Sequence, residues 1–158
     1  MSGTASITVE REAPDSLDSS VLVNAIERHL AERYPAESRH GYSVEKLIER
    51  EVAFFVARVN GAPAGCGGIE LVGADYCEIK RMWVDPAFRG LGLGRVVLER
   101  LLEHAREHGV DVVRLETGVD QVEAIGLYES FGFRQIPPFR PYFDDPVSLC
   151  FEAPSIPA

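Results

Sequence analysis

The stretch Arg89-Gly90-Leu91-Gly92-Leu93-Gly94, a glycine-rich turn between two regular elements, decides the fold. It follows a strand-like run at residues 77–84 and opens a segment with helical apolar spacing. Glycine lets the backbone approach a ligand closely, and the first N–H groups of a helix are unpaired and partly positive. Arg89 adds a charge suited to bidentate contacts with phosphate. The stretch therefore predicts a phosphate-binding turn at a helix N-terminus.

The spacing of the glycines disfavours the two commonest nucleotide-binding loops. The P-loop ends in a Gly-Lys-Ser/Thr triplet, and this sequence has none. The dinucleotide fingerprint reads Gly-x-Gly-x-x-Gly, whereas this turn reads Gly-x-Gly-x-Gly and is followed by Arg95. Asp111 stands where that fingerprint expects a ribose-binding acid, but acidic residues are common in this chain. ATPase and dehydrogenase functions are therefore disfavoured.

The turn resembles the Arg/Gln-x-x-Gly-x-Gly/Ala signature of the Gcn5-related N-acetyltransferases, the GNAT family, with Arg89, Gly92 and Gly94 at the fixed positions. Two flanking blocks are similar to the family's strand exit and late helix-to-strand segment: Val84-Asp85-Pro86 and Leu127-Tyr128-Glu129-Ser130-Phe131-Gly132-Phe133. The resemblance covers residues 52–152 well and says little about residues 1–50. It implies the GNAT fold, in which the parallel strands of a mixed sheet splay apart and coenzyme A enters the gap.

Length and composition set outer bounds on the function. The 158 residues suit a single domain, with its core at residues 52–152 and a frayed tail at residues 153–158. The formal net charge of −9 argues against a nucleic-acid partner, whose phosphates attract Lys and Arg, and leaves a cationic substrate open. Three cysteines without a Cys-x-x-Cys pair are typical of reduced core thiols in a cytoplasmic protein. We expect no signal segment and no membrane span.

Hydrophobic periodicity predicts an α/β (mixed α+β) chain, with hairpin-linked strands up to residue 84 and strands alternating with helices beyond it. The expected strands are residues 6–9, 52–58, 63–71, 76–84, 112–117, 133–136 and 148–152. The expected helices start at Asp15 or Ser16, at Ser43, after the glycine turn, and at Val122. Because strand–helix–strand connections are right-handed and join parallel strands, we expect a central mixed sheet flanked by helices. The family resemblance adds that this sheet is partly splayed.

Acetyl transfer to an amine requires a base. An amine of lysine type is protonated at pH 7, and removing its proton costs about 4.6 kcal/mol. Glu78 is the predicted base, because it lies on the strand before the turn and alternation points it away from Cys77 and Ile79. Its position is similar to that of the catalytic glutamate in histone-acetylating members of the family. The alternative for Glu78 is an ion pair with Lys80 or a neighbouring Arg.

The family resemblance implies the roles of the remaining site residues. Tyr128 matches the general acid that protonates the departing thiolate, and the alternative is a core tyrosine with its hydroxyl at the surface. Main-chain groups at Met82, Trp83 and Val84 are expected to bind the thioester and the pantetheine arm, with the Trp83 side chain in the core. Gln121 stands where many relatives carry Asn, and it is expected to contact the coenzyme. The coenzyme-binding residues expected in the turn are Arg89, Gly90, Leu91, Gly92, Leu93, Gly94 and Arg95.

Acceptor recognition is expected from the polar segment 34–41 and from residues 137–145, which combine prolines, aromatic side chains and carboxylates. Tyr142, Asp144 and Asp145 are the predicted substrate residues, because carboxylates attract a substrate ammonium; the alternative is an ordinary acidic turn. No metal site is predicted, because His104 and His108 share a helix face without a visible third ligand.

These features together predict an acetyl-CoA-dependent N-acetyltransferase in which a primary amine attacks the coenzyme thioester directly in a ternary complex. Two alternatives stay open: a non-catalytic acyl-CoA-binding or sensing module, and a transferase that acts on a protein N-terminus or lysine. The expected acceptor is therefore a small-molecule or peptide amine, with no nucleic acid, membrane or metal involved. Family members often pair as homodimers, although no feature of this sequence defines an interface.

Overall fold

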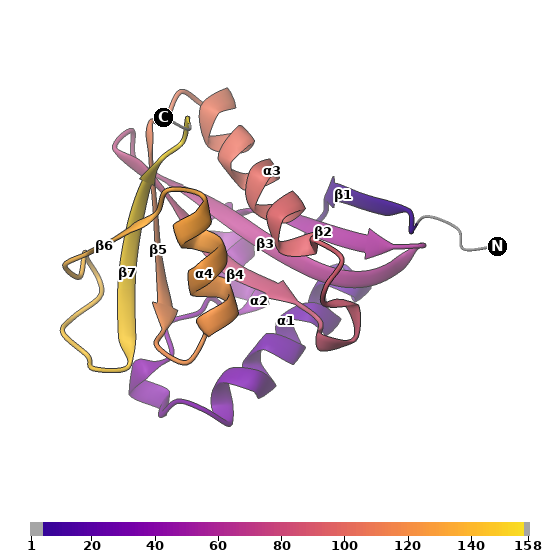
Figure 1. The fold of residues 1–158 in the computed structure, drawn as a ribbon, viewed down its shortest axis with the longest axis horizontal. Helices are drawn as coiled ribbons and strands as arrows, with labels where there is room; N and C mark the ends of the chain where they lie inside the picture. Colours follow the sequence, from indigo (N-terminus) through magenta and orange to yellow (C-terminus); the bar gives the residue numbers. More distant parts are fainter. Residues whose placement is uncertain (1–4, 157–158) are drawn as a thin grey trace.

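The computed structural model describes residues 5–156, whose strands form one seven-stranded sheet of order β1-β2-β3-β4-β5-β7-β6 (Figure 1). The strands are β1 (Ile7–Arg11), β2 (Ala53–Val59), β3 (Ala62–Val72), β4 (Tyr76–Val84), β5 (Val112–Gly118), β6 (Arg134–Ile136) and β7 (Ser148–Pro154). The α-helices are α1 (Leu17–Ala31), α2 (Val44–Glu49), α3 (Leu93–Glu107) and α4 (Val122–Ser130). Neighbouring strands are antiparallel except β4 and β5, which confirms the predicted mixed sheet flanked by helices.

Local sequence signals set the ends of these elements. The side-chain oxygens of Ser16 and Ser43 accept backbone hydrogen bonds and so cap α1 and α2. Asn60 and Gly61 both have positive φ in the hairpin between β2 and β3, as an Asn-Gly turn requires. Gly109, with φ of 69°, follows the end of α3. All expected strands and helices are present, and none of the helices in residues 5–156 has the length and apolar character to cross a membrane.

The C-terminal segment differs from the frayed tail expected at residues 153–158. Ala153 and Pro154 belong to β7, where they pair with β5. Ser155 is buried, and its N–H donates to the Asp111 carbonyl at 2.8 Å. The segment is therefore held to the sheet by main-chain hydrogen bonds, which cannot be predicted from the side chains of these residues. Residues 157–158 lie outside the described residues.

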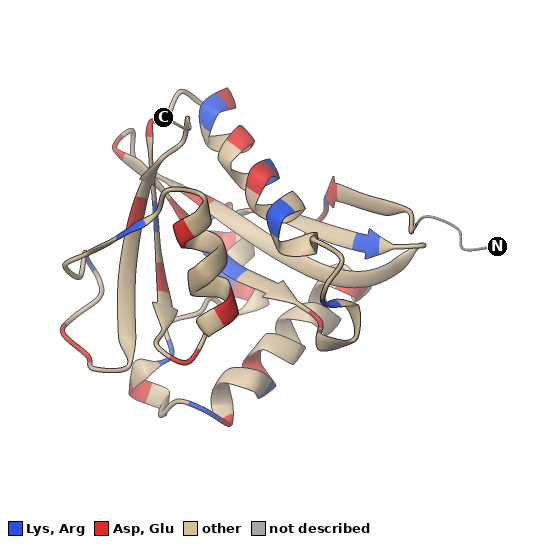
Figure 2. Ribbon diagram, viewed as in Figure 1, with Lys and Arg blue, Asp and Glu red and all other residues tan. Residues whose placement is uncertain are grey.

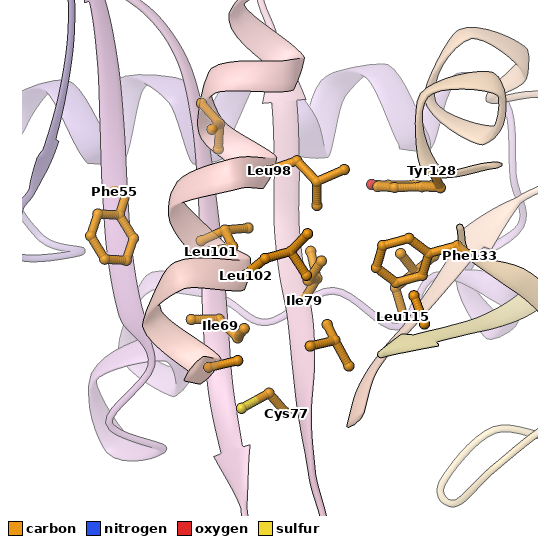
Figure 3. Packing of buried hydrophobic residues seen from close by; sticks show 14 of the residues in the cluster. Phe55, Ile69, Cys77, Ile79, Leu98, Leu101, Leu102, Leu115, Tyr128 and Phe133 are labelled. Atoms are coloured by element: carbon orange, nitrogen blue, oxygen red, sulfur yellow. The ribbon is translucent and has the colours of Figure 1, made fainter. Parts of the chain in front are cut away.

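Alternation along β2 divides the buried side chains between the two faces of the sheet. Phe55 belongs to a large cluster with α3 and α4, and Figure 3 shows Leu98, Leu101 and Leu102 of α3 in this cluster. Phe54 points to the other face, where it packs with Leu47 of α2 and the apolar side of α1. Burial of each large apolar side chain contributes roughly 1.5–3 kcal/mol. The outer face of α3 carries interspersed acidic and basic residues (Figure 2). The three cysteines are free and buried.

The parallel pair β4–β5 separates soon after it forms. Its register ends at Glu78 opposite Arg114, and Figure 1 shows the two strands running apart beyond this point with α4 in front of the gap. On its other side β4 has a bulge, because Arg81 and Met82 together lie opposite Gly67 of β3. Arg81 takes a left-handed φ of 55° there. The splay implied by the family resemblance is therefore present, next to a distorted central strand.

Candidate active site

The glycine-rich turn and the first residues of α3 line a groove of about 480 Å³. Gly92 caps α3 with a left-handed φ of 78°, and no side chain caps the helix there. A Cβ atom added at Gly90 or Gly92 would meet nothing within 4 Å. The start of α3 is therefore not blocked by side chains, and its first N–H groups carry the partial positive charge that an anion site uses.

The groove brings together most of the residues predicted to bind the coenzyme, namely Met82, Trp83, Val84, Arg89, Gly90, Gly92, Leu93, Gly94, Arg95 and Gln121. Leu91 is not part of its wall, and 44% of this residue is exposed. Arg89 lies 3.5 Å from the Glu123 carboxylate, but both side chains are exposed and such a pair is readily exchanged. The Gln121 amide contacts His29 at 3.2 Å and Tyr34 at 3.3 Å. The coenzyme roles of all these residues stay predictions.

A smaller cavity of about 120 Å³ adjoins the groove where β4 and β5 have separated. The two spaces share five wall residues, which are His29, Met82, Trp83, Gln121 and Ala124. The rest of the cavity wall comes from α1, the segment 34–41, β4, β5, α4 and Tyr142. A ligand that fills the groove would therefore end beside a second ligand in the cavity.

The segment 34–41 covers part of the cavity and is tied to three other parts of the chain. The Ser38 hydroxyl donates to the Asp145 carboxylate at 2.6 Å. The Tyr34 hydroxyl accepts from the Asp120 N–H at 3.0 Å. Beside Gly41, the Arg81 guanidinium donates to the Tyr42 carbonyl at 2.7 Å. These contacts hold the segment over the cavity.

Glu78 lies in a buried ionic cluster one contact away from the cavity. Its carboxylate is 2.8 Å from the Lys80 ammonium and accepts a hydrogen bond from the Tyr142 hydroxyl. Lys80 also donates to that hydroxyl at 2.8 Å and lies 4.1 Å from the centre of the Tyr42 ring. The ion pair with Lys80 that was the alternative for Glu78 is therefore present. Lys80 and Tyr142 line the cavity and Glu78 does not, so its role as base stays a prediction.

Glu116 of β5 supplies the carboxylate on the cavity wall. Burial raises the pKa of Glu116 above the usual carboxyl range, and the Ser148 hydroxyl, which donates to it at 2.5 Å, partly offsets that shift. Sequence reasoning missed this residue. Alternation along β5 places it on the face opposite Val113 and Leu115, but only the separation of β5 from β4 turns that face into a cavity wall.

Tyr128 reaches the same cavity from α4. Its ring packs near Phe133 with 5.7 Å between ring centres, and its hydroxyl end extends toward Leu98 (Figure 3). Burial, and then the charge of Glu116, raise the pKa of Tyr128, so its hydroxyl keeps its proton at neutral pH. The structure therefore places a protonated hydroxyl and a carboxylate on one wall. The role of Tyr128 as general acid stays a prediction.

The three predicted substrate residues lie in two different places. Tyr142 lines the cavity, whereas Asp144 and Asp145 line a separate surface hollow with residues 135–138. Asp145 is also engaged by Ser38 and by the Val147 N–H, which donates to it at 3.0 Å. The substrate roles of the two aspartates stay predictions, but their geometry fits a turn that anchors the segment 34–41.

The two histidines at the C-terminal end of α3 have a neighbour that the sequence-based prediction did not include. Ligand atoms of His104, Glu107 and His108 lie within 4.8 Å of one another, so the expectation that no third side chain accompanies these histidines is wrong. His104 is buried against Phe55, and burial lowers the pKa of His104 to about 4. The cluster is not part of the groove or the cavity.

Comparison with known proteins agrees with this geometry. Residues 22–133 match the family model described as the acetyltransferase (GNAT) family. The chain is 41% identical over 149 residues to an IAA acetyltransferase of Azospirillum brasilense, covering 94% of this chain and 97% of that protein. A Klebsiella pneumoniae protein described as an acyl-CoA N-acyltransferase superposes with a TM-score of 0.79 at 30% identity, covering 95% of this chain and 98% of that one.

A more distant structure shares the fold alone. The PaiA N-acetyltransferase of Thermoplasma acidophilum, solved in complex with coenzyme A, superposes with a TM-score of 0.72 at 16% identity. The match covers 94% of this chain and 99% of that one.

Proposed function

Because the chain belongs to the acetyltransferase (GNAT) family, we propose that its groove binds acetyl-CoA and that its cavity binds a small primary amine. The protein is an acyltransferase, an acetyl-CoA-dependent N-acetyltransferase. The amine attacks directly in a ternary complex, with no covalent enzyme intermediate. The observation that carries this proposal is the shared wall at Trp83 and Gln121, where the groove and the cavity meet.

The residues of the groove fit the diphosphate of coenzyme A. No side chain caps the start of α3, and Arg89 and Arg95 lie on the groove wall, so main-chain donors and guanidinium groups converge on one anion site. When bound, acetyl-CoA supplies an acetyl group in the form of a thioester. Past Glu78, the edge of β4 that faces the gap has no β5 partner. This supports main-chain contacts from Met82, Trp83 and Val84 to the thioester end of the ligand.

Glu116 takes the proton from the acceptor amine in the proposed mechanism. A carboxylate with a raised pKa is a stronger base than an exposed one, so it is better matched to an amine. Tyr128, protonated and on the same wall, donates a proton to the departing thiolate, which leaves as the coenzyme A thiol. Glu78 orients Lys80 and Tyr142 through its buried contacts. Glu78 as the base itself remains the competing prediction.

The size and cover of the cavity support a small acceptor over a protein segment. The cavity holds about 120 Å³, and the segment 34–41 is anchored over it through Ser38 and Tyr34. A protein N-terminus or lysine would require a wider opening. The wall position of Glu116 and Tyr128 also disfavours a sensing module, which needs no proton-transfer groups beside its ligand. A homodimer and a cytoplasmic location stay predictions.

The test is release of coenzyme A thiol by the purified protein with acetyl-CoA and a panel of small amines, beside calorimetric titration with acetyl-CoA alone. We expect binding in the titration and thiol release with a subset of the amines. Tight binding with no release from any amine would favour the sensing module. Absence of binding would contradict the assignment of the groove.

A further inference from the structure

The acceptor cavity carries more positive than negative side chains, although the whole protein has a formal net charge of −9. The Arg, Lys and Glu residues of its wall are Arg39, Lys80, Arg81 and Glu116. Lys80 is paired with the buried Glu78 at 2.8 Å, and Arg81 forms an ion pair with Glu27. These two cations are therefore neutralised by partners within the protein.

Arg39 is the cation on the wall without such a partner. Among residues 5–156, no ion pair involves Arg39, and its Nε atom is shielded from solvent with no hydrogen-bond partner. Leaving a buried donor unpaired is unfavourable, so the unpaired Nε–H of Arg39 is a site for a hydrogen-bond acceptor of a ligand. The neighbouring Ser38 is anchored to Asp145, which holds Arg39 on the cavity wall. A guanidinium matches a carboxylate because both can form two parallel hydrogen bonds.

We propose that the acceptor is an amino acid, with its carboxylate bound by Arg39 and its amine facing Glu116. The inference rests on the proposed function and specifies the substrate class of the same cavity. Ile26, Leu30 and Trp83 contribute apolar wall, so an apolar side chain fits best. The attraction of a substrate ammonium to Asp144 and Asp145 then plays no part, because those residues line a different hollow.

The experiment compares acceptors that differ only in the carboxylate. Alanine, leucine and phenylalanine are each assayed beside two analogues, the amide of the same amino acid and the amine that lacks its carboxylate. Rates are expressed per concentration of unprotonated amine. For at least one series, we expect kcat/KM of the amino acid to exceed that of both analogues by about 10- to 100-fold. Analogues that react as well as the amino acid in all three series would overturn the inference. No thiol release from any of these compounds or from the amine panel would instead contradict the proposed function.

Two variants locate the effect at Arg39. Arg39→Gln should raise KM for the amino acid about 10- to 100-fold and lower kcat/KM for its amide by a much smaller factor. Arg39→Lys keeps the charge but not the paired hydrogen bonds, so its KM for the amino acid should lie between those of the natural sequence and of Arg39→Gln. Arg28→Gln, at an exposed position of α1 outside the groove and the cavity, is the matched control and should change neither value. Equal losses for the amino acid and its amide in Arg39→Gln, with unchanged acetyl-CoA affinity, would show that Arg39 does not read the carboxylate.

Discussion

Replacing Glu116 by Gln should separate the chemistry of the site from its stability. Glu116 is a partly buried carboxylate on the cavity wall, and burial raises its pKa in the folded protein. Because the folded-state pKa lies above the unfolded one, the stability that this group contributes is present at low pH and lost as the pH rises through the folded pKa. Gln keeps the shape and removes the buried charge. At pH 7 the variant should therefore have a Tm no lower than that of the natural sequence.

The activity of the same variant should fall steeply. General base catalysis contributes roughly 10²- to 10⁴-fold, so kcat/KM should drop by about that factor. In the natural sequence, kcat/KM should decline as the pH falls through the pKa of Glu116, which lies above the usual carboxyl range. Glu116→Gln should lose this acid limb. The assay is thiol release across a pH series, with Tm measured by thermal unfolding on the same samples.

Glu78→Gln is the matched comparison, because it makes the same substitution at a buried carboxylate next to the cavity. It leaves the Lys80 ammonium without its partner at 2.8 Å, and breaking a buried pair costs about 3–5 kcal/mol. For a chain of this size, Tm should fall by on the order of 10 °C, with the acid limb kept. If Glu78→Gln loses the acid limb at an unchanged Tm while Glu116→Gln keeps it, Glu78 is the base and the reasoning from the cavity wall is refuted.

Three further substitutions test the groove, the segment 34–41 and the proton donor. Gly92→Asp places a negative charge at the start of α3 and should raise KM for acetyl-CoA by about 10-fold or more. Gly73→Asp is the control, because Gly73 has a similar left-handed φ in the turn between β3 and β4, and it should not raise this KM. Equal effects of the two substitutions would argue against a diphosphate site. Gly118→Ala adds a Cβ that overlaps the Tyr34 hydroxyl, so KM for the amine should rise and calorimetric affinity for acetyl-CoA should persist. Tyr128→Phe keeps the ring packing and should lower kcat by about 10- to 100-fold at nearly constant Tm; full activity would remove Tyr128 from catalysis.

Some parts of the site follow from residues that are neighbours in the sequence. The φ of Gly92 and the absence of a side-chain cap at the start of α3 depend on the composition of one turn, so the proposed anion site can be predicted from the glycine spacing. The caps at Ser16 and Ser43 and the Asn60-Gly61 hairpin are equally local. Such features can be predicted because the interactions that form them join residues a few positions apart.

The acceptor side could not be predicted in this way. Glu78 lies on β4, which is buried from Cys77 to Arg81, whereas Glu116 lies on β5, where burial alternates. The sequence offers Lys80 as an ion-pair partner for Glu78, but it does not show that Glu116 lines a cavity. Arg39 lies in a polar segment whose place over the cavity depends on the contact between Ser38 and Asp145.

The sequence by itself therefore determined the elements, the glycine turn and the class of coenzyme, because periodicity, capping and turn geometry are local. The tertiary structure alone decided which carboxylate lies on the cavity wall and which side chains form that cavity. Those depend on where β4 parts from β5 and on side chains far apart in the chain, whose burial and partners exist only after folding.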